Sequence, residues 1–447
     1  MSSIWKNSLA YIVSKYYVTG SFRQYFNKIH IHGEENLPEE GPVIFAPNHL
    51  NALMDALAVL SLPPHRLPKL FLARADLFRL PKVVVKFLRF AKILPAFRIR
   101  DGYDQLDRNK ATFEEAEKSL LNRASIGIMP EGNQGEERNI RPLVKGIFRI
   151  AFSAQQKMTN GMSVKIVPVG IEYGDIFSYQ ESLILNIGAP IDLADYMQLY
   201  ADNQVKATNE LKNTLRNALE SLTVHLPTGE NYPMYDALVE LAAPSVLSSG
   251  SSVTPLSLFN ARRRIAERLK TFGENDKQRF ESIRNIFSEY ADLATQLQLP
   301  VRKASRPFMP SMSPVRLQLE ILLLWLTAFP GTVLNYLPYR IIKAVPGLAG
   351  IHYSGFFSSV YFGAGIVVLP LYYLLLAAFI TGFTVLPWWS SGLLIPFFYF
   401  GGKLSFRLHR CIRDMQTDLQ VHQLQQRSGE QLNRLLTLRG QLLDLIR

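Results

Sequence analysis

Two long runs without a charged residue occupy the C-terminal part of this 447-residue chain and limit what it can fold into. The first run is Ile321 to Tyr339, and the second is Gly355 to Gly402. About 20 consecutive apolar residues are enough for a helix to cross the hydrocarbon core of a bilayer. The second run is long enough for two crossings, with a turn near Trp388 and Trp389, since paired tryptophans favour a membrane interface. The alternative is a buried hairpin in a soluble core, which such lengths disfavour.

Basic residues follow the second run directly, and they set the expected orientation of the C-terminus. They are Lys403, Arg407, Arg410 and Arg413. Positive charge next to a span is retained on the cytoplasmic side of a membrane. The sequence therefore predicts a cytoplasmic, helical tail over residues 406–447, in which Leu432, Leu435, Leu436, Leu442, Leu443 and Ile446 form an apolar stripe.

The charge balance narrows the class of partner but does not select one. The formal net charge is +12, which suits phosphate groups, anionic lipid headgroups or nucleic acid. The chain has one cysteine, Cys411, so it can form neither an internal disulfide nor a Cys-rich metal site.

Alternating strand and helix patterns indicate an α/β domain over residues 29–195. Short apolar runs, often bounded by Gly or Pro, predict strands at Ile29–Ile31, Val43–Ala46, Lys69–Ala73, Phe97–Arg100, Ser125–Met129, Val164–Val169 and Leu183–Ile187. Helical patterns between them cover Ala52–Leu60, Pro81–Phe90, Gln105–Leu121 and Gly146–Gln156.

Three further segments complete the expected organisation. Residues 1–28 form an amphipathic helix, which either lies on a membrane surface or packs on the α/β domain. Residues 196–305 are expected to form a helical insert with helices over Asn209–Leu226, Met234–Leu241, Leu256–Phe272 and Asp276–Leu297. Residues 306–405 are the C-terminal α-helical membrane segment.

The first candidate for chemistry is His49, which follows the predicted strand Val43–Ala46, together with Asp55 six residues later. On one continuous helix these two side chains point about 240° apart at 3.6 residues per turn. They can meet if His49 lies in the turn before the helix and Asp55 in its first turns. Asp55 would then fix the imidazole tautomer and leave the other nitrogen able to activate an alcohol. The alternative is that His49 only caps the helix.

The second candidate is a polar loop after the strand Ser125–Met129, together with an arginine after Phe97. The residues are Arg100, then Glu131 and Gly132, then Arg138, Arg141 and Lys145. Arginine binds phosphate through a planar, often bidentate fork. The loop therefore suits a phosphorylated ligand, while the alternative is ordinary solvated polar residues.

Taken in order, these segments resemble the glycerolphosphate acyltransferase family, of the lysophosphatidate acyltransferase type. The family's blocks match here as Asn48-His49 with Asp55, Phe97 to Arg100, Met129-Pro130-Glu131-Gly132, and Ile166-Val167-Pro168-Val169. The resemblance covers about residues 29–191. It implies an α/β acyltransferase domain with a mixed sheet flanked by helices. It also implies acyl-CoA or acyl-carrier protein as co-substrate, a glycerol-3-phosphate or lysophospholipid acceptor, and no metal or other cofactor.

The resemblance also assigns roles. His49 and Asp55 become the catalytic pair, Glu131 and Gly132 part of the acceptor site, and Arg100, Arg138, Arg141 and Lys145 its phosphate contacts. Backbone amides near the helix start would stabilise the oxyanion. Two departures stand out: His49 and Asp55 are separated by five residues rather than four, and Asn133-Gln134-Gly135 replaces the Thr-Arg-Ser of many bacterial members.

A domain that uses cytosolic donors belongs on the same side as the tail, so we expect an integral membrane protein with an even number of crossings. Ile321–Tyr339, broken at Pro330-Gly331, is then re-entrant or interfacial. Two other functions compete. A thioester or lipid hydrolase lacks its usual Gly-x-Ser-x-Gly turn here, and a non-enzymatic membrane adaptor would use the tail. Only charge favours nucleic acid, and the expected partners are the acyl donor, the lipid precursor and the membrane.

Overall fold

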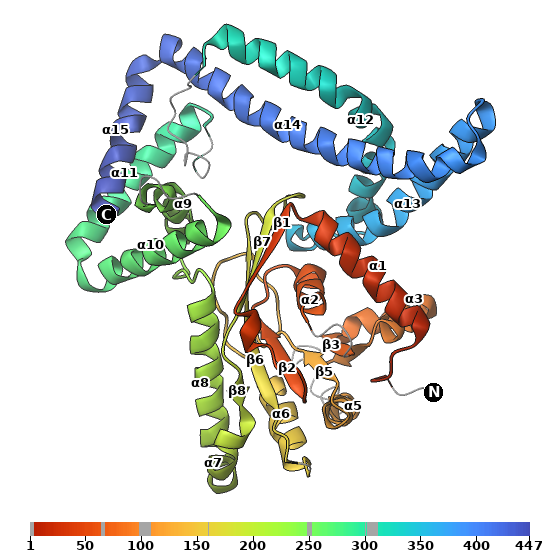
Figure 1. Ribbon diagram of the computed structural model, residues 1–447. Coiled ribbons are helices and arrows are strands. Elements are labelled where there is room, and N and C mark those ends of the chain that lie inside the picture. The colour runs from red at the N-terminus through yellow and green to blue at the C-terminus, as the bar shows by residue number, and fades with distance from the viewer. Residues whose placement is uncertain are drawn as a thin grey trace. The chain divides into compact units, whose positions relative to one another are not determined.

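The computed structural model describes residues 4–63, 68–97, 109–159, 161–247, 253–299, 301 and 312–447. The chain forms two compact units (Figure 1). The first unit consists of Met1–His225 and Tyr353–Ser359, and the second of Leu226–His352 and Val360–Arg447. A short segment far along the chain therefore belongs to the N-terminal unit.

A mixed sheet of eight strands is the centre of the first unit, in the order β1-β7-β6-β2-β5-β3-β4, with β8 paired to β6. All neighbouring pairs are parallel except β6 with β7 and β6 with β8. The bounds are β1 Lys28–His32, β2 Val43–Pro47, β3 Lys69–Arg74, β4 Ile93–Ala96, β5 Ser125–Gly127, β6 Lys165–Tyr173, β7 Ser182–Ile187 and β8 Ile191–Asp192. The expected mixed α/β sheet is confirmed.

One predicted strand is misplaced. We expected Phe97–Arg100, but β4 is the run Ile93–Ala96 immediately before it, which pairs with β3 from Phe71↔Ile93 onward. The apolar side chains decide this, because Leu94 is buried in the core. Phe97 follows the strand, and Arg98–Arg100 lie outside the described residues.

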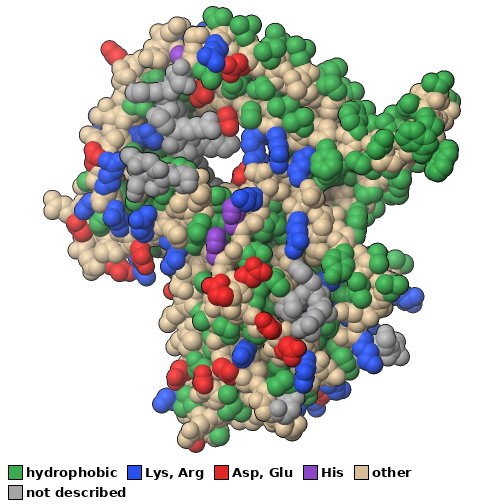
Figure 2. Space-filling view, in the orientation of Figure 1, with side chains coloured by type: hydrophobic (Ala, Val, Ile, Leu, Met, Phe, Trp, Pro, Cys, Tyr) green, Lys and Arg blue, Asp and Glu red, His purple; other side chains and the backbone are tan. Residues whose placement is uncertain are grey.

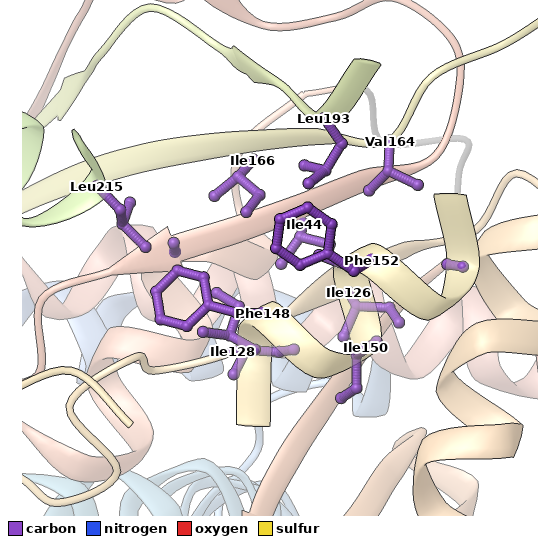
Figure 3. Close-up of a cluster of buried hydrophobic side chains, with 14 of the residues drawn as sticks. Ile44, Ile126, Ile128, Phe148, Ile150, Phe152, Val164, Ile166, Leu193 and Leu215 are labelled. Atoms are coloured by element: carbon purple, nitrogen blue, oxygen red, sulfur yellow. The ribbon is translucent and has the colours of Figure 1, made fainter. Parts of the chain in front are cut away.

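Helices cover both faces of this sheet. Their bounds are α1 Leu9–Tyr25, α2 Ala52–Leu60, α3 Lys82–Phe90, α5 Asn109–Leu121, α6 Gly146–Gln156, α7 Met197–Asp202 and α8 Gln204–Leu222. On one face, Ile44 pairs in register with both Ile126 and Ile166, so the three isoleucines project together. They pack with Phe148 and Phe152 of α6 in a buried cluster (Figure 3).

The structure places α7 and α8 in the unit of the sheet, although we expected a separate helical insert from residue 196. Leu211, Leu215 and Leu219 recur every four residues on α8, and each is fully buried in the cluster against the sheet. The apolar stripe therefore identifies a core helix of the first unit, which ends at His225.

The N-terminal helix α1 packs on the domain with one face. Tyr11 and Phe22 are buried, whereas Leu9, Val13 and Tyr16 are exposed. The helix thus packs on the α/β domain, which was one of the two expected arrangements, and its outer surface remains apolar.

The second unit is entirely helical over its described residues. Its helices are α9 Tyr232–Ala242, α10 Pro255–Asn275, α11 Lys277–Gln296, α12 Pro314–Leu348, α13 Phe357–Phe383, α14 Ser391–Arg427 and α15 Gly429–Ile446, with the first turn of α13 belonging to the first unit. Four residues of the predicted stripe are buried on α15, namely Leu432, Leu435, Leu442 and Ile446, whereas Leu436 and Leu443 are half-buried. The helix α15 packs beside α11 (Figure 1).

Among the described residues, two helices have the length and apolar composition of a membrane span: Pro314–Leu348 and Ser354–Phe383. Their large apolar side chains are mostly exposed, as Leu326 on α12 and Leu375 on α13 are, and Figure 2 shows hydrophobic side chains gathered on the surface of this part of the unit. The apolar residues 391–402 form the start of α14, which continues into charged sequence.

The break that we expected at Pro330-Gly331 is absent, because α12 runs through both residues. Its glycine serves a helix crossing instead. A Cβ on Gly331 would lie 2.4 Å from the carbonyl oxygen of Gly401 on α14, so only glycine allows this approach.

Candidate active site

The strand register brings the two predicted loops together. Phe45 of β2 pairs with Gly127 of β5 in parallel, so residues four positions beyond each strand partner emerge at the same edge of the sheet. These residues are His49 and Glu131. The backbone N–H of His49 donates to Oε1 of Glu131 at 2.8 Å.

His49 and Asp55 meet as the turn-then-helix arrangement requires. Nδ1 of His49 lies 2.8 Å from Oδ2 of Asp55. His49 is in the turn before α2, and Asp55 is in the first turn of that helix, with its side chain fully buried. The backbone N–H groups of Leu50 and Asn51 also donate to Oδ2 of Asp55. Because Asp55 occupies Nδ1, Nε2 is the nitrogen that can accept a proton from a substrate.

Tyr173 completes the support of Asp55, and we did not anticipate it from the sequence. Its hydroxyl donates to Oδ1 of Asp55 at 2.6 Å. Burial raises the pKa of the Tyr173 hydroxyl well above its usual value, and the neighbouring Asp55 raises it further. The hydroxyl therefore remains a donor. The available signal was the length of β6, which continues past Gly170 to end at Tyr173, beside the site.

Asn48 fixes the start of the turn that carries His49. Its side-chain oxygen accepts from the N–H of Ile171 at 2.6 Å, and its side-chain nitrogen donates to the carbonyl of Ile171 at 3.1 Å. Asn48 therefore continues the pairing of β2 with β6 beyond the end of β2. This role explains why an asparagine precedes the histidine.

Glu131 is buried, and both of its carboxylate oxygens contact the protein itself. Oε1 accepts from His49, while Oε2 accepts from the backbone N–H of Arg141 and forms an ion pair with its guanidinium at 2.9 Å. Burial raises the pKa of Glu131, and Arg141 and the two N–H groups oppose that rise. In these contacts Glu131 holds the two loops together, whereas the resemblance assigned it to the acceptor site.

Gly132 allows the loop to turn at this point. Its φ is +69°, in the left-handed region, and its N–H donates to the carbonyl of Met129. An added Cβ would meet Val144 at 3.1 Å, so a larger residue would be both strained and tightly packed.

The four cations that we predicted for the acceptor site differ in their surroundings. The Arg141 guanidinium contacts Glu131 and the carbonyl of His49, at 2.6 Å. Lys145 is exposed at the start of α6, and Arg138 is half-buried in the same loop. Arg100 lies outside the described residues. Lys145 and Arg138 are thus the other predicted cations that lie in the described part of this loop.

The backbone amides at the start of α2 are occupied, which bears on the expected oxyanion site. Those of Leu50 and Asn51 donate to Asp55, and that of Leu53 donates to the hydroxyl of Ser359. The amides of Met54 and Asp55 donate to the carbonyl of Asn51. These five groups are therefore not free to bind a developing oxyanion.

The turn between His49 and Asp55 has an unusual backbone conformation. Ala52 has a φ of +31°, and Asn51 before it has φ −141° and ψ 63°. A left-handed φ is uncommon for a residue with a side chain and is retained only where the surroundings enforce it. The longer turn thus still brings Asp55 to the imidazole.

Comparison with known proteins identifies the family of the N-terminal part of the chain. The profile of the acyltransferase family matches residues 28–172, which include all four sequence blocks. Residues 28–172 belong to the acyltransferase family. Within the described residues, no group of three or more His, Cys, Asp or Glu side chains is placed to hold a metal ion.

Relatives of the acyltransferase domain come from yeast and bacteria. Glycerol-3-phosphate O-acyltransferase 2 of Saccharomyces cerevisiae is 28% identical over 136 residues, which is 30% of this chain and 17% of that protein. Glycerol-3-phosphate O-acyltransferase 1 of the same yeast is 25% identical, over 48% of this chain and 28% of that protein. A 1-acyl-sn-glycerol-3-phosphate acyltransferase of Borreliella burgdorferi is 26% identical, over 44% and 74%. The chain therefore spans less than a third of either yeast relative.

Among solved structures, the 1-acyl-sn-glycerophosphate acyltransferase of Thermotoga maritima is similar to this chain. It is 19% identical and covers 47% of this chain and 79% of its own, with a TM-score of 0.35.

Proposed function

We propose that the chain is a membrane-bound O-acyltransferase that transfers a fatty acyl group from acyl-CoA or acyl-carrier protein to glycerol-3-phosphate or 1-acyl-glycerol-3-phosphate. The observation that carries the proposal is the contact between Nδ1 of His49 and Asp55 inside a domain of the acyltransferase family. The named activities of the yeast and bacterial relatives support this choice of acceptors.

The mechanism follows from the arrangement of His49. Asp55 holds the imidazole in the tautomer whose Nε2 is basic, and Nε2 removes the proton of the acceptor hydroxyl. The resulting alkoxide attacks the thioester carbonyl, and the tetrahedral intermediate collapses with release of the thiol, which takes the proton back from His49. No covalent bond to the enzyme forms. Lys145 and Arg138 are the described cations that we assign to the acceptor phosphate, with Arg100 as a further candidate.

The membrane assignment rests on the two apolar helices. The charge-free residues 321–339 of α12 and the whole of α13 are poorly solvated by water and well solvated by lipid. An acceptor or product with a fatty chain also resides in a bilayer. We place the acyltransferase domain and the tail on the cytoplasmic face, because the basic residues after position 402 favour that side.

The test is a transfer assay on membranes that contain the full chain, in which each acceptor is combined with each donor. Replacement of His49 by Ala should lower transfer at least a thousandfold while the amount of folded protein stays constant. His30→Ala, a half-buried histidine on β1, is the matched control and should keep wild-type transfer. Fatty acid released without any acceptor would identify a hydrolase instead, and unchanged transfer by His49→Ala would exclude the mechanism.

A further inference from the structure

The segment Tyr353–Ser359 lies about 300 residues after the catalytic turn and is nevertheless part of the same compact unit. It precedes and includes the first turn of α13, one of the two candidate membrane helices. The start of a candidate span is thus built into the acyltransferase domain.

Two neighbouring serines of this segment bind the catalytic turn. The hydroxyl of Ser358 donates to the side-chain oxygen of Asn51 at 2.7 Å. The hydroxyl oxygen of Ser359 accepts from the backbone N–H of Leu53 at 3.1 Å. Both serines are buried. Ser359 therefore caps α2 from a distant part of the chain, since the N-cap Asn51 makes no side-chain capping bond of its own.

The residues that these serines hold are the strained part of the turn. Ala52, with its left-handed φ, lies between Asn51 and Leu53, the two residues that Ser358 and Ser359 bind. The side chain of Asn51 is held on its other side by the carbonyl of Ile176. The backbone N–H of Asn51 donates to Asp55, so any relaxation of this turn would move a donor of the proposed catalytic carboxylate. A turn with one extra residue needs such outside support.

We propose that Ser358 and Ser359 are positioning residues, which hold the lengthened turn so that Asp55 faces His49, and that catalysis therefore requires the start of α13 to be docked on the acyltransferase domain. This inference rests on the proposed function, because it assigns the turn a catalytic purpose. It adds a contribution from the C-terminal half of the chain to a site that the family pattern confines to residues 28–172.

Ser354 provides a matched comparison within the same segment. Its hydroxyl donates to Oε1 of Glu136 at 2.8 Å, and this contact is exposed and does not involve the turn. Ser354→Ala removes a tether between the segment and the domain but leaves Asn51 and Leu53 supported. If the segment were only a tether, the three serine variants would behave alike.

The experiment measures kcat and both KM values for the full chain in membranes with Ser358→Ala, Ser359→Ala, the double variant and Ser354→Ala. The proposal predicts that Ser359→Ala lowers kcat about tenfold, equivalent to about 1.4 kcal/mol, with both KM values within twofold of wild type. Ser354→Ala should keep wild-type kcat. Adding Ala52→Gly to Ser359→Ala should raise kcat at least threefold above that of Ser359→Ala alone. Glycine adopts a left-handed φ without steric strain, so the turn then depends less on the Ser359 contact.

Hydrogen exchange of the peptide that contains residues 50–55, followed by mass spectrometry, gives a readout independent of turnover. Exchange should rise in Ser358→Ala and Ser359→Ala and not in Ser354→Ala. The proposal is overturned if exchange is unchanged in the double variant, or if the double variant keeps a kcat within twofold of wild type. If the wild-type chain transfers no acyl group, the proposed function fails, whereas the exchange result still decides whether the two serines hold the turn.

Discussion

The hydroxyl of Tyr173 supports the proposed catalytic carboxylate, and Tyr173→Phe isolates that support. The change removes one oxygen and keeps the ring, which packs against Phe26 with ring centroids 6.0 Å apart. Asp55 has four described donors in the wild type: His49, the N–H groups of Leu50 and Asn51, and Tyr173. The variant leaves Oδ1 without its Tyr173 donor in a site where Asp55 is fully buried.

The size of the effect follows from the charge of the acceptor. A hydrogen bond to a charged group contributes about 1.5–3 kcal/mol, and a buried acceptor that loses its donor is not compensated by water. We therefore expect the free energy of unfolding to fall by about 1.5–3 kcal/mol. We expect kcat to fall about tenfold, less than for His49→Ala, because Nδ1 keeps its contact with Oδ2 while the carboxylate loses one restraint. KM for the acceptor should not change.

The assay combines steady-state transfer kinetics with thermal unfolding of the detergent-solubilised protein. Tyr290→Phe is the matched control, because the Tyr290 hydroxyl is buried without a hydrogen-bond partner among the described residues. Its removal should leave kcat unchanged and stability equal or higher. The reasoning is refuted if Tyr173→Phe retains both the kcat and the melting temperature of the wild type.

Three further changes test the loops, the core and the helix crossing. Glu131→Gln should lower kcat at least tenfold with little change in acceptor KM, because an amide has one acceptor oxygen and cannot accept from both His49 and Arg141 as the carboxylate does. A raised KM with unchanged kcat would instead support a role for Glu131 in binding the acceptor. Burial lowers the pKa of Lys69 to about 7, so the fold disfavours its charged form, and stability should rise between about pH 7 and pH 10 by at most about 1.4 kcal/mol per unit. Melting curves of Lys69→Met that keep the same rise would contradict this. Gly331→Val should destabilise the α12–α14 crossing by about 1–3 kcal/mol in thermal melts, while Gly347→Ala, with open space around its Cβ, should not.

The local sequence predicted most of the first unit because its signals are local. Val43–Ala46 and Ala52–Leu60 appear as β2 and α2 with nearly the expected bounds, since a buried apolar run and a helical period each need only neighbouring residues. The meeting of His49 and Asp55 could also be reasoned out, because residues six apart can approach only through a turn. The left-handed φ of Ala52 could not be predicted, because it depends on where the folded domain places His49 and Asp55 relative to each other.

Two predicted elements were misplaced. The strand that pairs with β3 is Ile93–Ala96, whereas we expected one over Phe97–Arg100, of which Arg98–Arg100 lie outside the described residues. We expected the helix α8 to belong to a separate helical insert, whereas it packs against the sheet of the first unit. An apolar stripe indicates that one face of a helix is buried, but it does not indicate which element covers that face. Tyr173 was missed for a related reason: its role depends on how far β6 extends beside Asn48.

The contacts of Ser358 and Ser359 could not be predicted from the four sequence blocks, because both serines lie far outside them. The four blocks contain the residues that we propose for the chemistry, and all of them lie within residues 28–172. A serine that restrains a turn is required only where that turn is strained, and the left-handed Ala52 is one of the five residues between His49 and Asp55. The departure from the family spacing and the docking of a distant segment are therefore best understood as one feature, in which an insertion near the imidazole is stabilised by residues from the start of α13.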